Sequence, residues 1–156
     1  MKVFNKLMLG AAALALLPGC SLFQSKVSYD KFHEKAVAAH DKGHSYTKAV
    51  VSGDMSGSGL SIKMDKIEFV LASGVWQPKG DSSGFDVMAA SAYVGMEARS
   101  VPEDDESTYY VGNGFKVTMK DDDGKGTAQF NAAGLLTSYK AESDSSKANI
   151  TIKYSK

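Results

Sequence analysis

The sequence predicts an α+β fold, in which a curved antiparallel β-sheet of about seven or eight strands carries two helices packed on one face. Two segments, near residues 29–42 and 85–98, place apolar residues at helical spacing. Most of the remaining chain alternates apolar and polar residues, and clusters of Gly, Ser, Asn and Asp separate these runs. Because strands outnumber helices and follow one another directly, an antiparallel sheet is favoured over parallel βαβ units.

The first helix is predicted from Tyr29 to Lys42. Ser28 is a suitable N-cap, because its hydroxyl can accept a hydrogen bond from a backbone N–H of the first turn. Gly43 suits the position just after the last turn. The apolar stripe of this segment is modest, so we expect the helix to cover one face of the sheet.

Strands are predicted over residues 46–53 and from Leu60 onward, on either side of a Gly/Ser-rich hairpin connection. Apolar residues are even-numbered up to Met64 and odd-numbered from Ile67. Because a shift of one residue turns every side chain of a strand to the opposite face, a bulge or tight turn is predicted at Asp65-Lys66. Val75 is expected to begin a further short strand.

The second helix is predicted from Phe85 to about Ala98, with an apolar stripe stronger than that of the first. The stripe recurs at the i, i+3, i+4 spacing and comprises Phe85, Met88, Ala89, Ala92, Tyr93 and Met96. Pro102 and the acidic run Glu103–Glu106 terminate the helix.

From Thr108 the chain is predicted to form an antiparallel meander of short strands that ends near Tyr154. The acidic run Asp121–Gly124 is interpreted as a β-turn. A calcium-binding EF-hand loop would need carboxylates where Met119 and Phe130 stand, so that interpretation fails.

The N-terminal residues have the layout of a secretory signal. Lys2 and Lys6 precede an apolar run, Leu7 to Leu17, that contains no charged or polar side chain. At about 1.5 Å rise per residue this run spans only about half of a roughly 30 Å hydrocarbon core, so a permanent transmembrane helix is not expected.

The apolar run closes with Leu17-Pro18-Gly19-Cys20, which resembles the lipobox of bacterial lipoproteins. Leu17, Gly19 and Cys20 match that pattern, while Pro18 is a less usual occupant of the second position. The resemblance implies that the Cys20 thiol receives a diacylglycerol, that the peptide is cut before it, and that the new amino group is often acylated. It covers only these 20 residues, and the competing interpretation is an ordinary secretory signal.

The resemblance implies a cleaved signal peptide (1–19) and a lipidated N-terminus, which is followed by a short tether (20–27). The length and pattern of the remaining chain predict a single α+β domain (28–156). Two or three acyl chains, such as palmitate, anchor a protein stably, whereas one chain binds only marginally. The expected location is the outer membrane if the host has one, and otherwise the outer face of the cytoplasmic membrane. In layout alone, the predicted domain resembles the lipoprotein-localisation carriers and related lipid-binding lipoproteins of the cell envelope.

Composition limits the partners of the domain. After residue 19 the chain carries 18 acidic and 16 basic residues, a formal charge of −2, so there is no basic surplus to attract nucleic acid or anionic lipid. Because Cys20 is the only cysteine, no intramolecular disulfide can form and the domain must hold together by packing. We expect a monomer.

No catalytic residue, metal site or cofactor is predicted. His33 and His40 lie too far apart along a helix to share a zinc ion, and Gly43 separates His40 from His44. Ser28–Lys31 and Ser45–Lys48 match the S-x-x-K nucleophile pattern, but its companion S-D-N and K-T-G motifs are absent. Beside the two binding hypotheses given in the next paragraph, a hydrolase that uses Ser28 and Lys31 is kept as a third, which covalent labelling of Ser28 would test.

Four aromatic residues, Trp76, Tyr109, Tyr110 and Phe115, are the candidates for lining a ligand pocket, although such residues more often form a core. The leading hypothesis is a non-enzymatic, lipid-anchored envelope protein that binds a hydrophobic ligand or another envelope component. The alternative is a structural or surface-interaction lipoprotein without a ligand cavity. An apolar pocket of several hundred Å³ would favour the first hypothesis, and a solid core would favour the second.

Overall fold

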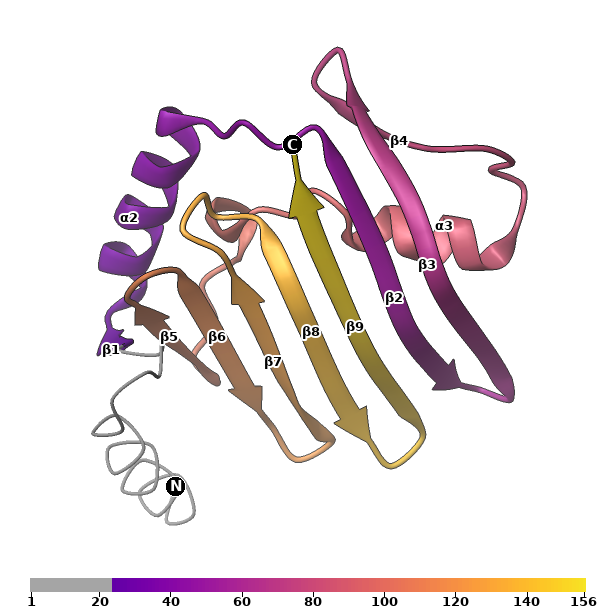
Figure 1. Ribbon diagram of the computed structural model, residues 1–156. Coiled ribbons are helices and arrows are strands. Elements are labelled where there is room, and N and C mark those ends of the chain that lie inside the picture. Colours follow the sequence, from indigo (N-terminus) through magenta and orange to yellow (C-terminus); the bar gives the residue numbers. More distant parts are fainter. Residues whose placement is uncertain (1–23) are drawn as a thin grey trace, which may run out of the picture.

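The computed structural model describes residues 24–156, which form one antiparallel sheet with two α-helices, as the sequence predicts (Figure 1). The signal peptide and Cys20 lie outside the described residues. The described sheet has nine strands rather than seven or eight. The strands are β1 (Ser25–Val27), β2 (Lys48–Gly57), β3 (Leu60–Ala72), β4 (Val75–Pro78), β5 (Ser107–Val111), β6 (Phe115–Lys120), β7 (Gly124–Phe130), β8 (Leu136–Ser143) and β9 (Ser146–Ser155). The helices are α2 (Tyr29–Lys42), α3 (Phe85–Tyr93) and the short 3₁₀ turn η1 (Ala98–Ser100).

The strand order is β1-β5-β6-β7-β8-β9-β2-β3-β4, and every neighbouring pair is antiparallel. Strands β5 to β9 form a continuous meander. The last strand, β9, lies between β8 and β2 and therefore joins the meander to the N-terminal strands β2, β3 and β4. The two edges of the sheet are the short strands β1 and β4.

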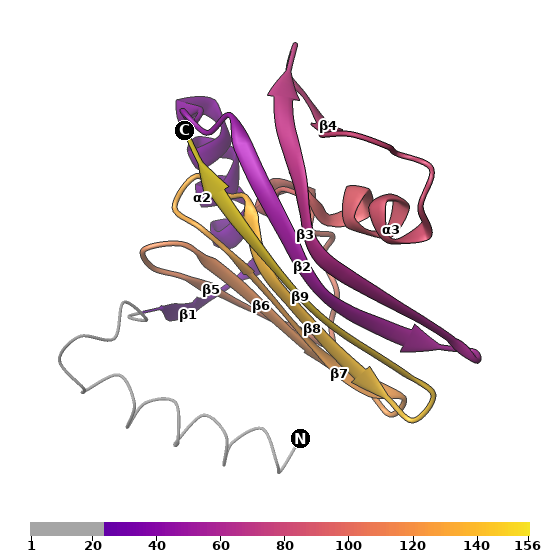
Figure 2. The same ribbon diagram turned by 45° about the vertical axis from the view of Figure 1, so that its right-hand side comes forward.

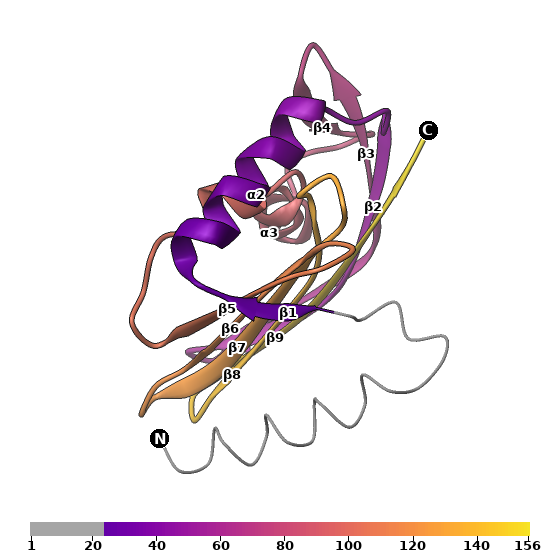
Figure 3. The same ribbon diagram turned by 90° about the vertical axis from the view of Figure 1, so that its left-hand side faces the viewer.

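Both α-helices lie on the same side of the curved sheet, which we call the helix face (Figure 3). Helix α2 contacts β5 and η1, whereas α3 contacts β3 and β4, so the helices cover opposite edges. The opposite side of the sheet, which we call the outer face, carries no helix of the described chain (Figure 3). The hairpin ends of β2–β3, β6–β7 and β8–β9 extend beyond both helices (Figure 2).

The core fills the space between the helices and the sheet. Phe32 of α2 is 0% exposed, and its ring packs against Tyr109 at 5.2 Å and Phe115 at 5.7 Å between centroids. Leu136 and Ile150 supply fully buried side chains from the centre of the sheet. Because apolar burial is the dominant favourable term in folding, this layer anchors α2 to the meander.

The start and end of α2 are confirmed. The Ser28 hydroxyl accepts a hydrogen bond from the Lys31 backbone N–H at 3.3 Å, which satisfies one free donor of the first turn. Gly43 has φ +68° and donates its N–H to the His40 carbonyl, so it ends the helix in a conformation that favours glycine.

The bulge predicted in the long strand β3 is also confirmed. Val51 pairs with Ile67 and Gly53 pairs with Met64, so Ser52 alone faces the two residues Asp65 and Lys66. Lys66 has φ +53°, in the left-handed region. The bulge turns the odd-numbered apolar residues of β3 toward the helix face, where the even-numbered ones before it also point.

The prediction of a second helix reaching Ala98 is wrong, because α3 ends at Tyr93. Gly95 has φ +74°, and its N–H donates to the Tyr154 hydroxyl rather than continuing the helix. Two further backbone groups pair with the start of β8: the Met96 carbonyl accepts from Leu136, and the Ala98 N–H donates to Gly134. These long-range hydrogen bonds replace the helical ones.

The orientation of α3 also differs from the expectation. Ala90 is its buried residue, while Phe85 is 75% exposed and Met88 is 61% exposed. Phe85 and Met88 of the apolar stripe therefore point away from the sheet, while Ala90 is buried and Tyr93 lies 5.4 Å from Tyr139 of β8 between ring centroids.

Three residues of the tether expected over residues 20–27, Ser25–Val27, pair with β5 as strand β1. The hairpin connection expected at 54–59 is also shorter, because β2 extends to Gly57. Within the described residues, neither helix combines the length and apolar character needed to cross a bilayer.

Candidate functional site

One row of uncharged side chains crosses the helix face where the helices no longer cover it. Register pairs the six residues across neighbouring strands in the order Ile62, Met55, Ala148, Ala141, Gly126 and Met119. We call this row the uncharged strip. Its residues lie two positions from core residues such as Ile150 and Val117, and a strand repeats every two residues, so they point to the same face.

The uncharged strip is accessible. Met119 is 39% exposed, and the other five members are half-buried. Gly126, Ala141 and Ala148 carry little or no side chain, whereas Met55, Ile62 and Met119 flank them with longer ones. Because the middle residues are small and the end residues are larger, the surface of the row is recessed in its middle relative to its ends. Methionine and isoleucine there can adapt to an apolar surface.

The next row toward the hairpin ends is uncharged as well. It consists of Leu60, Gly57, Ser146, Ser143 and Gly124, in register across β3, β2, β9, β8 and β7. Leu60 is 58% exposed. The end of the sheet that carries these two rows extends past the helices (Figure 2). Because neither row contains a charged residue, together they form one apolar and neutral surface.

An aromatic cluster occupies the opposite end of the helix face. Trp76 of β4 lies 5.5 Å from Tyr154 of β9 and 6.4 Å from His44, between ring centroids. Tyr46 lies 5.6 Å from Tyr154 and completes the cluster. The His44 ring stacks on Trp76 with an interplanar angle of 16°, and its Nδ1 accepts a hydrogen bond from the Tyr46 backbone N–H.

The Tyr154 hydroxyl is held under the loop after α3, where it accepts the Gly95 N–H at 3.1 Å. Burial raises the pKa of Tyr154 to about 12, because the phenolate would lose hydration there. Gly95 itself lies against Trp76, and a Cβ at this position would stand 2.3 Å from the indole Cδ1. Glycine is therefore required both for the positive φ and for the approach of the indole.

The four aromatic residues proposed from the sequence do not form one site. Tyr109 and Phe115 are 5% and 4% exposed and pack around Phe32. Trp76 belongs to the cluster with Tyr154 at the other edge of the sheet. Tyr110 points to the outer face, where the Lys116 ammonium lies 4.9 Å from its ring centroid.

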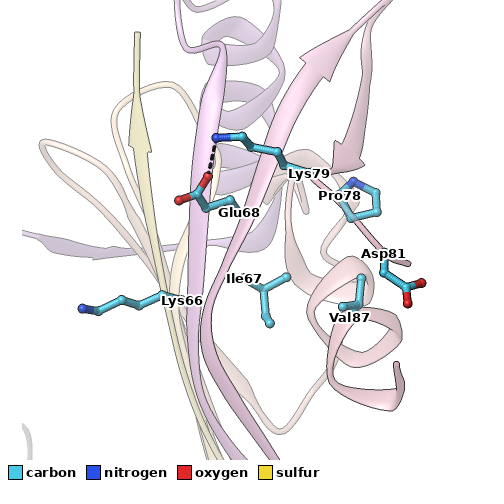
Figure 4. A pocket seen from close by; sticks show the side chains of 7 residues that line it. All are labelled: Lys66, Ile67, Glu68, Pro78, Lys79, Asp81 and Val87. Carbon is cyan, nitrogen blue, oxygen red and sulfur yellow. Dashed lines mark hydrogen bonds and ion pairs between the residues drawn. The ribbon is translucent and has the colours of Figure 1, made fainter. Parts of the chain in front are cut away.

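An open depression of about 330 Å³ lies between β3, the end of β4 and α3 (Figure 4). Ile67, Pro78 and Val87 form its apolar wall. The remaining lining residues are charged: Lys66, Glu68, Lys79 and Asp81. Lys79 and Glu68 form an exposed ion pair at 3.0 Å. Because charge surrounds so much of it, this depression is a poor match for an apolar ligand.

His40 and the acidic run Asp121–Asp123 take structural roles in the described chain. His40 and Arg99 both pair with Glu97, which links the end of α2 to η1. The acidic turn is as predicted, since the Asp121 carboxylate accepts the backbone N–H groups of Asp123 and Gly124. Among residues 24–156 there is no group of three or more His, Cys, Asp or Glu side chains arranged to hold a metal ion.

The sequence carried part of the signal for the uncharged strip, because the alternation of β3, β6, β8 and β9 continues to their hairpin ends. Met55 was expected in a hairpin connection instead. The sequence did not show the register between neighbouring strands, and this register places the hairpin ends of the strands side by side. Tyr154 and Gly95 are 59 residues apart, and nothing local predicts their hydrogen bond.

Comparison with known proteins gives no relative from which a role could be transferred. No protein-family model matches this chain, and a search of curated proteins finds no match. Its function has to be inferred from its own residues.

Proposed function

We propose that this protein is a non-enzymatic lipoprotein of the cell envelope, anchored by lipid on Cys20, whose domain binds an apolar ligand or an apolar patch of another envelope component. The lipobox-like residues 17–20 support the anchor. The observation that carries the binding role is the uncharged strip, which exposes methionine and small residues across six strands.

The ligand rests on the surface in this proposal rather than inside the fold. Beneath α2 the space is filled by Phe32 and its aromatic neighbours, and beneath α3 by Ala90, Val94 and the strand residues they contact. The uncharged strip instead offers a broad face that can accept an acyl chain or a hydrophobic side chain. Burial of exposed apolar area supplies about 25 cal/mol per Å² toward such binding.

The filled core specifically favours a second candidate function, a structural or surface-interaction lipoprotein without a ligand cavity. In that case the exposed apolar residues contact another envelope protein. The two candidates differ in the occupant of the same surface, so an apolar small-molecule probe separates them.

The anchor is tested by Cys20→Ser. We expect this variant to lose its fatty acids and to leave the membrane fraction or to remain uncleaved, because serine cannot form the thioether. Mass spectrometry of the N-terminal peptide and membrane fractionation measure both effects. Unchanged lipid incorporation would contradict the anchor.

The strip is tested by Ala148→Asp, which places a carboxylate in its middle. A matched control is Asn149→Asp, the neighbouring residue on the outer face. The probe is a spin-labelled fatty acid. We expect roughly tenfold weaker binding for Ala148→Asp, because burying an unpaired charge is costly, and wild-type binding for the control. Equal binding by all three proteins would contradict the strip as a ligand site. An absence of binding to the wild type would leave the second candidate as the better proposal.

A further inference from the structure

The charges of this protein are separated by the sheet, although they nearly cancel over the chain. Nine lysines point to the outer face: Lys26, Lys48, Lys63, Lys116, Lys120, Lys125, Lys140, Lys147 and Lys153. Three acidic residues are placed on that face by register: Asp54, Glu68 and Glu142. Without the unpaired bulge residues Asp65 and Lys66, the outer face therefore carries a formal charge of nine minus three, or +6.

The rest of the described chain has the opposite sign. Its helices, loops and C-terminal residue, together with the bulge residues Asp65 and Lys66 of β3, carry seven basic and fifteen acidic residues, a formal charge of −8. The two values sum to the −2 of residues 24–156. A neutral overall composition thus conceals a dipolar molecule with one broad positive face, and the sequence-based conclusion that no basic surplus exists does not hold for this face.

Most of this positive charge is available. Eight of the nine outer-face lysines are exposed, and Lys116 is half-buried beside Tyr110. Glu142 pairs with Lys125 at 3.4 Å and with Lys147 at 3.0 Å. In the described part of the chain, Lys63, Lys140 and Lys153 form no ion pair, so their ammonium groups face solvent unneutralised.

The form of this charge suits a surface better than a compact ligand. The lysines are distributed over seven strands that lie about 4.8 Å apart, and they do not converge on a pocket. The single arginine, Arg99, lies in η1 and not on the outer face. The outer face therefore has no guanidinium group to bind one phosphate in a bidentate manner. Dispersed lysines attract an anionic lipid surface collectively.

The position of the anchor favours the same partner. Strand β1 begins at Ser25, five residues after Cys20. An extended chain reaches at most about 3.4 Å per residue, so a lipid on Cys20 keeps this sheet edge within about 17 Å of the bilayer. Surface electrostatics act over about one Debye length, roughly 10 Å at 0.1 M salt. A sheet held this close can lie on the membrane if its charge is complementary.

We propose that the outer face of the sheet docks on an anionic phospholipid bilayer, which leaves the helix face and the uncharged strip directed away from that membrane. This inference rests on the proposed lipid anchor for the proximity of the sheet, and on the outer-face lysines for its orientation. In this proposal the positive outer face holds the domain on the membrane, and the opposite, helix face binds the apolar ligand or partner.

The test uses the mature, lipid-bearing protein in vesicles of phosphatidylcholine alone or with about one third phosphatidylglycerol. Lysine acetylation is followed by mass spectrometry. We expect Lys63, Lys140 and Lys153 to react at least about threefold more slowly on the anionic vesicles, and the difference to vanish near 1 M salt, where the Debye length is about 3 Å. The exposed lysines of α2, Lys31 and Lys35, should react equally on both.

A charge-reversal variant and a matched control sharpen the result. The triple variant Lys63→Glu, Lys140→Glu and Lys153→Glu should lose the protection of the remaining outer-face lysines. The control, Lys31→Glu, Lys35→Glu and Lys42→Glu, makes the same change in net charge on α2 and should retain that protection.

Each other outcome has a defined meaning. Flotation in a density gradient shows whether the protein stays bound to the vesicles. Equal acetylation on neutral and anionic vesicles overturns the docked orientation, but the anchor stands if the protein floats together with both kinds of vesicle. Membrane docking is also overturned if dissolved polyphosphate, added to the protein on neutral vesicles, slows the acetylation of the same lysines as much as anionic vesicles do. If the protein floats only with anionic vesicles, and salt releases it, the docking face stands and the anchor fails. Flotation with neither overturns both.

Discussion

Raising the pH toward 12 tests the burial of Tyr154, which fixes the loop after α3 against the aromatic cluster. The pKa of this phenol is raised to about 12 in the folded protein, compared with 10.0 for an ordinary tyrosine. In the unfolded chain the group therefore loses its proton first. Between pH 10 and pH 12 the folded state binds more protons than the unfolded state, so the free energy of unfolding falls as pH rises.

The size of the effect follows from the two pKa values. The stabilisation is fully present below pH 10 and is lost as the pH rises toward 12. At pH 11 the loss is about 1.4 kcal/mol, since one pH unit of differential titration corresponds to about 1.36 kcal/mol. Tyr154→Phe removes this titration but also removes the acceptor for the Gly95 N–H, at a cost of about 1 kcal/mol at every pH. The stability advantage of the wild type over Tyr154→Phe should therefore shrink by about 1.4 kcal/mol between pH 7 and pH 11.

Urea unfolding measures this change through the fluorescence of Trp76, the only tryptophan, whose ring lies 5.5 Å from that of Tyr154. Both proteins are unfolded at a series of pH values from 7 to 11.5. Other groups titrate in the same way in both proteins, so the difference between them isolates Tyr154. A difference that stays constant over the whole range would refute the shielding of this hydroxyl.

Two packing predictions use the same unfolding assay. Phe32→Ala should lower the free energy of unfolding by about 3–5 kcal/mol, because it removes a fully buried ring that packs on Tyr109; a loss below about 1 kcal/mol would show that α2 is not packed there. Gly53→Ala should cost several kcal/mol, because φ is +145° and the new Cβ would lie 2.1 Å from the Asn149 carbonyl oxygen. Gly59→Ala, in open space at φ +78°, is the control and should cost about 1–2 kcal/mol; equal losses would contradict the bulge geometry.

The features that the sequence predicted well are those with local causes. Ser28 and Gly43 set the limits of α2 through hydrogen bonds to residues three positions away. The change of parity before Ile67 located the bulge, because a buried face cannot change sides within one strand. Glycine-rich and acidic connections placed most of the hairpins.

The failures have long-range causes. A strong apolar stripe predicted that α3 would reach Ala98, but Gly95 and the residues after it hydrogen-bond to Tyr154 and to the start of β8. These partners lie about 40 to 60 residues along the chain, so no helical pattern could reveal them. Tertiary pairing here overrides a local preference.

The candidate site could not be assembled from the sequence for the same reason. Alternation alone shows that Met119 and Ala148 each share a face with the apolar residues of their own strand, but only register places them in one row. Likewise, the count of charges shows a net value near zero, and only the strand faces show that the lysines gather on one side. Trp76 and Tyr109 were grouped by residue type, yet they stand at opposite edges of the sheet.

The place of β9 between β8 and β2 has a consequence for the order in which this protein can fold. The hairpin of β2 and β3 forms early in the chain, but its other neighbour is a strand made from the last residues, Ser146–Ser155. The sheet therefore cannot grow stepwise from its beginning, and its two halves join only when β9 pairs with both β8 and β2. Such distant pairings slow folding, because the loop-closure entropy is lost before the contacts form. Deleting those ten residues would separate the sheet into two parts rather than shorten it by one edge.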